Sequence, residues 1–354
     1  MVAISLLTLV PGLSGGSETY ARELCRTLAR IGELDYRVYL PTIATDAGGA
    51  LDTVVVDEYR ASRTMPGRIG AMSLAVVRPG PLRRALELDS HDAIHFPLSV
   101  MLPRVERPPA VTTVLDLQHE EHPQFFGRAE LAYRKAVYSW SIRRSRIVIT
   151  ISEHARASLL ERYDLSPERV RAIHLAVDHV RFSPDNRPRG DYVLYPARPW
   201  PHKNHARLYD AFTLLRRERS DLRLVLTGEG DFGRLPPGVE ARGRVSADAL
   251  VDLYCGAAAV VFPSLYEGFG MPVVEAMACG CPVACSNAAS LPEVVGDAAR
   301  LFDPTDAEAI AGATNDVLRD PAPWIARGLE RAQLFTWESN ARAHDAVYRE
   351  LASS

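Results

Sequence analysis

The chain has 354 residues, of which 47% are hydrophobic and 24% are charged. At about 100 to 200 residues per domain, this composition predicts two ordinary globular domains and excludes a disordered or fibrous chain. The 41 basic and 44 acidic residues leave a net charge of −3. No overall field therefore favours nucleic acid or an acidic membrane, and any basic surface must be local.

The opening residues, Met1 to Val10, are apolar but lack a basic flank and lead directly into Pro11 and Gly12. This pattern predicts a first β-strand and not a signal peptide. No stretch of the sequence approaches the roughly 20 apolar residues of a membrane span. We therefore expect a cytoplasmic protein whose membrane contact is at most peripheral.

Short apolar runs alternate with amphipathic stretches in the first half of the chain, which is typical of a parallel sheet with crossover helices. Clear helical patterns are Glu18 to Ile31 and Ser152 to Tyr163, the second with Ser152 as N-cap. The predicted strands are Val2 to Val10, Tyr36 to Leu40, Thr53 to Val56, Ala93 to Phe96, Ala110 to Leu115 and Ile147 to Ile151. Most are rich in β-branched residues without alternation, as expected for strands buried on both faces.

Residues Phe182 to Asp191 hold two prolines and a glycine and almost no apolar residue, which predicts an interdomain linker. A second series follows, with strands at 192–196, 222–227, 258–262 and 282–284 and helices at 204–219, 246–255, 272–278, 306–319 and 323–351. The sequence thus predicts an α/β chain of two Rossmann-like, doubly wound domains, 1–182 and 190–336. We expect them to face each other across a cleft that binds ligand at the carboxyl ends of the strands.

Two elements are suited to phosphate. The loop PGLSGGS follows the first strand, and its Gly15 and Gly16 allow an anion or a sugar hydroxyl to approach the start of a helix. In PARPWPHKN, Arg198 and Lys203 lie between the first strand and the first helix of the second domain. A guanidinium and an ammonium at this place can neutralise a leaving diphosphate without a metal ion.

The segment FPSLYEGFGMPVVEAMACGCPVAC follows a buried strand and begins a helix near Pro272. A carboxylate can accept two hydrogen bonds at once, so we assign Glu275 to the hydroxyls of a ribose and Glu267 to hydroxyls of a donor sugar. The cysteines at 279, 281 and 285 match no zinc pattern, and their apolar neighbours favour a buried strand. The chain has no Asp-x-Asp pair, so we expect no metal ion and no other cofactor.

Taken together, these motifs resemble the retaining glycosyltransferases of family 4, which have the GT-B fold. The resemblance rests on Arg198 and Lys203, on Glu267 and Glu275 in YEGFGMPVVEAMACGCPV, on Gly228-Glu229-Gly230 and on Gly15-Gly16-Ser17-Glu18. It implies a nucleotide-sugar donor in the second domain, an acceptor in the first, and a final helix, 337–354, that returns to the first domain. It also implies donor contacts from Gly228, Glu229, Val245, Leu250, Gly268, Phe269, Gly270 and Met271.

The resemblance further implies that the acceptor hydroxyl attacks on the face from which the diphosphate leaves, and that the departing phosphate takes the proton. Many members carry a His-Asp pair where this chain has Leu115 and Asp116. The sugar-contacting imidazole is then missing or supplied by His119, so Asp116 and His119 join the catalytic candidates. PARPWPHKN and SLPEVVGDAA are most similar to bacterial mannosyl- and rhamnosyltransferases.

GDP-mannose is therefore the first donor we expect, with UDP- and dTDP-sugars left open. A dehydrogenase is excluded because neither PGLSGGS nor LTGEG is a dinucleotide fingerprint. A non-catalytic sugar-nucleotide-binding subunit stays open.

A basic, aromatic stretch runs from Gly127 to Arg146 and is predicted to be helical. Its cations are Arg134, Lys135, Arg143, Arg144 and Arg146, and its aromatic residues include Tyr133, Tyr138 and Trp140. This helix either touches anionic lipid and presents a lipid-linked acceptor, or is a solvated helix whose aromatic side chains pack into the core.

Overall fold

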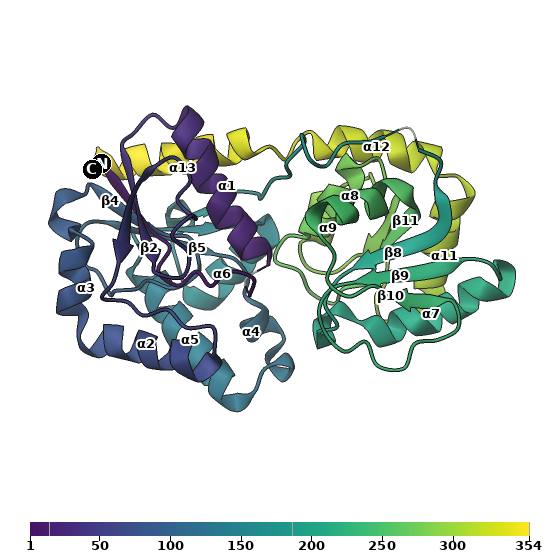
Figure 1. Ribbon diagram of the computed structural model, residues 1–354, viewed down its shortest axis with the longest axis horizontal. Helices are drawn as coiled ribbons and strands as arrows, with labels where there is room; N and C mark the ends of the chain where they lie inside the picture. Colours follow the sequence, from purple (N-terminus) through teal and green to yellow (C-terminus); the bar gives the residue numbers. More distant parts are fainter. Residues whose placement is uncertain (14, 186, 354) are drawn as a thin grey trace. The chain divides into compact units, whose positions relative to one another are not determined.

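A computed structural model describes residues 1–13, 15–185 and 187–353, without the side chains of Met65 and Pro66. Ser14 of the predicted glycine-rich loop and Asn186 of the predicted linker therefore lie outside the described residues. The chain divides into two compact units, the first made of Met1–Leu175 and Trp337–Ser354 and the second of Ala176–Thr336 (Figure 1).

The first unit is built on a parallel sheet of seven strands in the order β3-β2-β1-β4-β5-β6-β7. The strands are β1 Val2–Ser5, β2 Tyr36–Pro41, β3 Asp52–Val56, β4 Ala93–Phe96, β5 Ala110–Val114, β6 Ile147–Thr150 and β7 Val170–Ala172. Every residue of β4, β5 and β6 is buried, as the runs of β-branched residues predict. The first strand is shorter than predicted, because the chain turns after Ser5.

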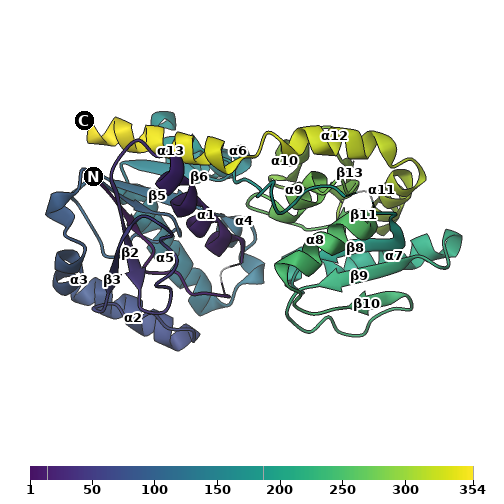
Figure 2. The same cartoon turned by 45° about the horizontal axis from the view of Figure 1, so that its top comes forward.

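Helices cover the sheet of the first unit (Figure 2). They are α1 Gly16–Ile31, α2 Met65–Val77, α3 Pro79–Ala85, α4 Gln118–Glu121, α5 Arg128–Arg144, α6 Glu153–Tyr163 and α13 Trp337–Ala352, with 3₁₀ turns η1 Leu88–Ser90, η2 Pro123–Phe125 and η3 Pro167–Arg169. Side chains of α2, α3 and α5 share one hydrophobic core with the sheet. Neither α2 nor α3 was predicted from the sequence.

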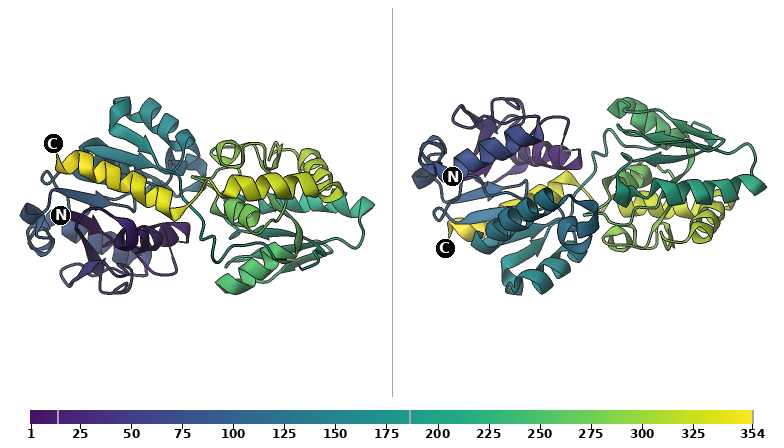
Figure 3. Two further views of the ribbon diagram at one scale, coloured as in Figure 1. Left: turned by 90° about the horizontal axis from the view of Figure 1, so that it is seen from above. Right: turned by 90° about the horizontal axis from the view of Figure 1, so that it is seen from below.

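Helix α13 lies beside α1, and this packing is seen from above in Figure 3. A network of buried hydrogen bonds holds α13 in this position. The Tyr20 hydroxyl lies 2.8 Å from Nε2 of His344 and 2.9 Å from Oγ1 of Thr113. His95 lies 2.8 Å from the same Thr113 oxygen and 2.7 Å from the Tyr348 hydroxyl. The final helix therefore belongs to the first unit, which confirms the predicted return of the chain.

The second unit has a parallel sheet of six strands in the order β10-β9-β8-β11-β12-β13. The strands are β8 Gly190–Pro196, β9 Arg223–Thr227, β10 Val239–Ala241, β11 Ala257–Phe262, β12 Val283–Ser286 and β13 Arg300–Phe302. Its helices are the 3₁₀ turn η4 Pro201–Lys203, α7 His205–Glu218, α8 Ala247–Gly256, α9 Met271–Ala278, α10 Leu291–Val295, α11 Ala307–Arg319 and α12 Ala322–Ala332. The long last helix predicted at 323–351 is in fact two helices, α12 and α13. Two parallel, doubly wound sheets confirm the predicted fold class.

Candidate functional site

The carboxyl ends of β8 and β11 mark the point where the second sheet changes its direction of winding. From β8 the chain adds β9 and β10 on one side, and then β11, β12 and β13 on the other. Ligands of open α/β sheets bind at this point, because the loops that follow the two adjacent strands lead away in opposite directions. Most of the predicted donor residues lie in the loops after β8, β9 and β11.

Lys203 and Glu267 join the two loops across this point. The Nζ atom of Lys203, at the end of η4, lies 2.6 Å from Oε1 of Glu267 in the loop after β11, and the two side chains are only 13% and 11% exposed. The Tyr195 hydroxyl donates to the Lys203 carbonyl at 2.7 Å, and the Asn204 side chain donates to the Pro263 carbonyl at 3.0 Å. The ion pair is therefore held by contacts to the main chain on both sides.

Arg198 lies in the same loop after β8 as Lys203 and is partly exposed. Its guanidinium is 3.7 Å from a carboxylate oxygen of Glu229 and 5.5 Å from the ring centre of Trp200. Gly228 has a φ of 129°, and a Cβ there would lie 2.9 Å from the backbone of Ala197. Only glycine fits so close to another main chain, so the loops after β8 and β9 are packed backbone to backbone beside Arg198.

The loop Glu267–Gly270 turns into helix α9 under tight constraints. Gly270 caps the helix with a φ of 108°, and a Cβ at this position would lie 2.7 Å from Leu291. The buried hydroxyl of Ser290, after β12, lies 2.9 Å from the carbonyl oxygens of both Glu267 and Phe269. The first turn of a helix leaves N–H groups unpaired within the helix and carries a partial positive charge, which favours an anion.

Glu275 lies one turn inside α9 and is largely buried. Its carboxylate accepts a hydrogen bond of 2.9 Å from the Tyr254 hydroxyl on α8. Burial raises the pKa of Glu275 to about 7, and the Tyr254 hydrogen bond opposes this rise. Near neutral pH the carboxyl group is therefore poised between its two forms, a property that is frequent at functional sites.

The remaining residues predicted to contact the donor lie on several different elements of the second unit. Gly268 and Met271 flank the cap of α9, with Phe269 buried between them. Leu250 lies on α8, and Val245 lines a separate groove together with Tyr192 and Arg242. Sequence reasoning missed Tyr195, Asn204 and Ser290, and also Gly243, whose carbonyl accepts from the Gly228 N–H at 2.8 Å.

In the first unit, the glycine-rich loop lies at the carboxyl end of β1. The N–H of Gly12 donates to Glu18 at 2.8 Å, and Glu18 also binds Arg22 at 2.9 Å. Gly15 caps α1 with a φ of 49°, and a Cβ placed on it would meet no atom within 4 Å among the described residues. This backbone is open to a ligand, next to the exposed Gly16.

Asp116 follows β5 and accepts a 3.2 Å hydrogen bond from the Gln118 N–H. The imidazole of His119 is fully buried, with its ring centre 4.7 Å from that of Tyr138, and within the described residues neither of its nitrogens has a hydrogen-bond partner. Burial lowers the pKa of His119. In this conformation the side chain does not reach solvent, so contact with a sugar requires α4 to move.

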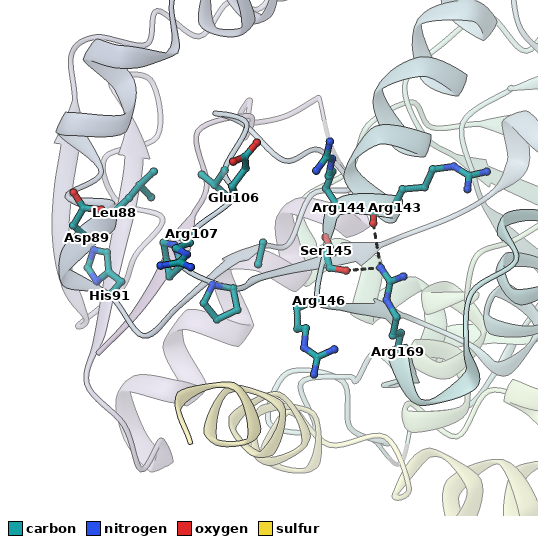
Figure 4. A pocket seen from close by; sticks show the side chains of 14 residues that line it. Leu88, Asp89, His91, Glu106, Arg107, Arg143, Arg144, Ser145, Arg146 and Arg169 are labelled. Carbon is teal, nitrogen blue, oxygen red and sulfur yellow. Dashed lines mark hydrogen bonds between the residues drawn. The ribbon is translucent and has the colours of Figure 1, made fainter. Parts of the chain in front are cut away.

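The five predicted cations of the basic stretch fall into two groups. On the described helix α5, Arg134 pairs with Glu130 at 3.0 Å and Lys135 with Glu120 at 3.5 Å. The other three, Arg143, Arg144 and Arg146, line a pocket of about 670 Å³ together with Arg107 and Arg169 (Figure 4). This pocket lies by Ala110, where β5 begins, and so at the opposite edge of the sheet from Asp116.

The described residues contain no helix long and apolar enough to cross a membrane. Among those same residues, no group of three or more His, Cys, Asp or Glu side chains is arranged to hold a metal ion.

Comparison with known proteins assigns the chain to a family. Residues 14–181 match Glycosyltransferase Family 4, and residues 177–334 match Glycosyl transferases group 1. The O-antigen chain mannosyltransferase B of Escherichia coli is 34% identical over 73% of this chain and 75% of that protein. The MMP alpha-(1->4)-mannosyltransferase of Mycolicibacterium hassiacum is 34% identical over 57% of this chain and 53% of that protein.

Among solved structures, a sucrose-phosphate synthase from Thermosynechococcus elongatus covers 100% of this chain and 99% of its own, with a TM-score of 0.79 at 22% identity. A glycosyltransferase involved in lipopolysaccharide biosynthesis covers 98% of this chain and 99% of its own, with a TM-score of 0.72 at 16% identity. Two Rossmann-like units of this topology, with a last helix that returns to the first, define the GT-B class of glycosyltransferases. The chain belongs to glycosyltransferase family 4, which confirms the resemblance in its motifs. Enzymes of this family bind a nucleotide-sugar donor and an acceptor.

Proposed function

We propose that this enzyme transfers mannose from GDP-mannose to a saccharide or lipid-linked acceptor, with retention of configuration and without a metal ion. Support for mannose comes from the relatives at 34% identity, both of which are mannosyltransferases. A UDP- or dTDP-sugar, rhamnosyl or glucosyl, is the alternative donor. The reaction serves polysaccharide or glycolipid synthesis, as the name of the Escherichia coli relative suggests.

The observation that carries the proposal is the enclosed ion pair of Lys203 and Glu267 at the point where the sheet changes direction. Without ligand, each charge neutralises the other. A bound donor offers each a better partner, because diphosphate oxygens attract the ammonium and sugar hydroxyls donate to the carboxylate. Arg198, from the same loop as Lys203, and the start of α9, after the loop of Glu267, add positive charge, so the leaving diphosphate is stabilised by the protein itself.

The proposed step needs no protein nucleophile. The acceptor oxygen forms a bond to the anomeric carbon on the face from which the diphosphate leaves, while the bond between that carbon and the phosphate oxygen breaks. The acceptor proton passes to a departing phosphate oxygen. Glu275 binds the ribose hydroxyls, and its raised pKa suits a group that both accepts and donates hydrogen bonds.

The first unit is proposed to bind the acceptor, with the open backbone at Gly15 and Gly16 facing donor phosphate or acceptor hydroxyls. Asp116 and His119 stay candidates for contact with the transferred sugar. Since the His119 ring is enclosed, its part in catalysis depends on the short helix α4 opening.

The test is a transfer and hydrolysis assay of the full chain with GDP-mannose, UDP-glucose and dTDP-rhamnose, with and without EDTA. We expect release of GDP from GDP-mannose in the presence of EDTA, even without acceptor. Lys203→Ala and Arg198→Ala should each lower turnover by about 100-fold or more, by analogy with the loss of one oxyanion donor.

The matched control is Arg207→Ala, which removes a cation from a surface pair with Asp210 on the neighbouring helix α7. This variant should keep full turnover. Unchanged turnover in Lys203→Ala would contradict the proposed mechanism. Binding of GDP without any release from GDP-mannose would favour a non-catalytic sugar-nucleotide-binding subunit.

A further inference from the structure

Helix α2 of the first unit carries an apolar face that the protein core does not cover. Its inner side is packed, since Ala75 is buried and Met72 accepts a hydrogen bond of 2.9 Å from the Tyr133 hydroxyl. On the outer side, Leu74 is 58% exposed and Val77 is 76% exposed. Ile69 and Val76 are also exposed.

The exposed residues follow helical spacing. Ile69, Ser73 and Val77 lie four residues apart, with Gly70 and Leu74 beside them, so all project from one side of the helix. No charged residue interrupts this side between positions 69 and 77. A helix on the surface of a soluble protein normally carries charged residues there, so this face is typical of one that contacts another apolar phase.

The charges of the segment that contains this face are all positive, and the acidic residues Asp57, Glu58 and Glu87 lie just outside it. Between Tyr59 and Leu86 the sequence has six arginines and no acidic residue, although the whole chain has a net charge of −3. Five of these arginines, 60, 63, 78, 83 and 84, are exposed. In the described part of the chain none of the five forms an ion pair, whereas Arg22 and Arg37 of the same unit each bind carboxylates.

We propose that α2 with its flanking arginines is a docking surface for an anionic lipid bilayer. Leu74, Val77 and Ile69 enter the boundary between head groups and acyl chains, and the arginines bind lipid phosphates. Charge complementarity selects this occupant, because an apolar face on a segment whose only charges are arginines fits an anionic surface. The inference does not depend on the donor proposed above.

This surface differs from the basic stretch of α5 that the sequence suggested. The exposed cations Arg143, Arg144 and Arg146 line a pocket at the start of β5, whereas the large exposed apolar side chains on the described helices of the first unit lie on α2. The two surfaces can therefore be distinguished by substitution.

The experiment is co-sedimentation of the full chain with vesicles of phosphatidylcholine, alone or with 30 mol% phosphatidylglycerol. We expect binding to the anionic vesicles that weakens as salt is added, and about tenfold weaker binding for the double variant Leu74→Ser/Val77→Ser. The matched control is Val180→Ser/Leu334→Ser, which replaces two apolar residues that are 93% and 63% exposed in the second unit and should change nothing.

A second pair of variants tests the charges. Arg78→Gln/Arg84→Gln should weaken binding about 25-fold, at about fivefold for each arginine near the bilayer surface, while Arg144→Gln/Arg146→Gln should bind like the original chain. Equal melting temperatures and equal far-ultraviolet circular dichroism spectra establish that each variant is folded.

Three results overturn the proposal. They are no binding to anionic vesicles, loss of binding in the Arg144/Arg146 variant alone, and a dimer without lipid that Leu74→Ser/Val77→Ser dissociates. The last result would assign the face to a second copy of the chain.

Discussion

At the scale of single residues, Glu275 links stability to binding. Its pKa is about 7 in the folded protein, compared with an ordinary value of 4.5, because the carboxyl group is largely removed from water. Between pH 4.5 and about pH 7, Glu275 keeps its proton in the folded chain but has released it in the unfolded chain. The free energy of unfolding therefore falls as the pH rises through this range. At alkaline pH the buried, charged Glu275 carboxylate therefore lowers the stability of the fold, and contacts with a bound nucleotide would offset this loss.

This predicts that Glu275→Gln raises the melting temperature at pH 8 by about 2–4 °C, roughly 1 kcal/mol, and has little effect at pH 4. The same variant should weaken the binding of nucleoside diphosphate, since an amide replaces the proposed ribose contact. Calorimetry at both pH values, with and without GDP, measures the two effects. A variant stabilised equally at pH 4 and pH 8 would show that the carboxyl charge is not the cause.

The individual site residues differ in how far the sequence could predict them. Arg198, Lys203 and Glu267 lie in the segments after predicted strands and Glu275 lies in a predicted helix that follows one, so their place near the edge of the sheet could be inferred locally. The contact from Ser290 could not, because it comes from the loop after β12 and depends on strand order. The raised pKa of Glu275 likewise depends on burial in the folded unit, which no local pattern encodes.

At the scale of elements, α13 is fastened to the first unit by buried histidines. Burial lowers the pKa of His344 to about 4 and holds the pKa of His95 well below its ordinary value of 6.5. As the pH falls from 6.5 to about 4, the unfolded chain gains protons that the folded network excludes, so stability is lost. Protonation would also place two positive charges beside each other without a carboxylate between them.

We therefore expect the backbone amides of α13 to exchange hydrogen faster at pH 5 than at pH 7, after correction for the intrinsic pH dependence. His344→Gln removes one titrating group and should flatten this difference. The exposed His174 provides the matched control, because His174→Gln should leave the pH dependence unchanged. Exchange in α13 that depends on pH to the same extent in all three proteins would contradict a histidine origin.

Helices and strands also differ in how well they could be predicted from the sequence. Apolar runs of four or five residues predicted β4, β5 and β6, whereas β7, β10 and β13 have three residues each and pair with a neighbouring strand. Helix α2 escaped prediction because its exposed side is apolar, so the alternation of apolar and polar faces that marks a surface helix is absent. The side of α2 that lacks the expected polar residues is the same side that we propose as the lipid-docking surface.

At the scale of the whole molecule, the two units have separate sheets and separate cores, so a donor that binds mainly one of them should stabilise that one selectively. A ligand at 100 times its dissociation constant adds about 2.7 kcal/mol to the part of the structure that binds it. In hydrogen exchange with GDP at this concentration, we expect protection in residues 198–203, 228–230 and 267–275 of the second unit. We expect little change in strands β2 and β3 of the first unit, residues 36–41 and 52–56, which contain none of the proposed donor contacts.

The same measurement with UDP and dTDP ranks the donors, because protection scales with the logarithm of saturation. Stronger protection by UDP than by GDP at equal concentration would replace GDP-mannose by a UDP-sugar and leave the site in place. Protection of the first unit alone would reject the assignment of donor binding to the loops around Lys203 and Glu267. Lys203→Ala serves as the internal control, since the loss of its charge should reduce protection by all three nucleotides alike if the ammonium binds the diphosphate and not the base.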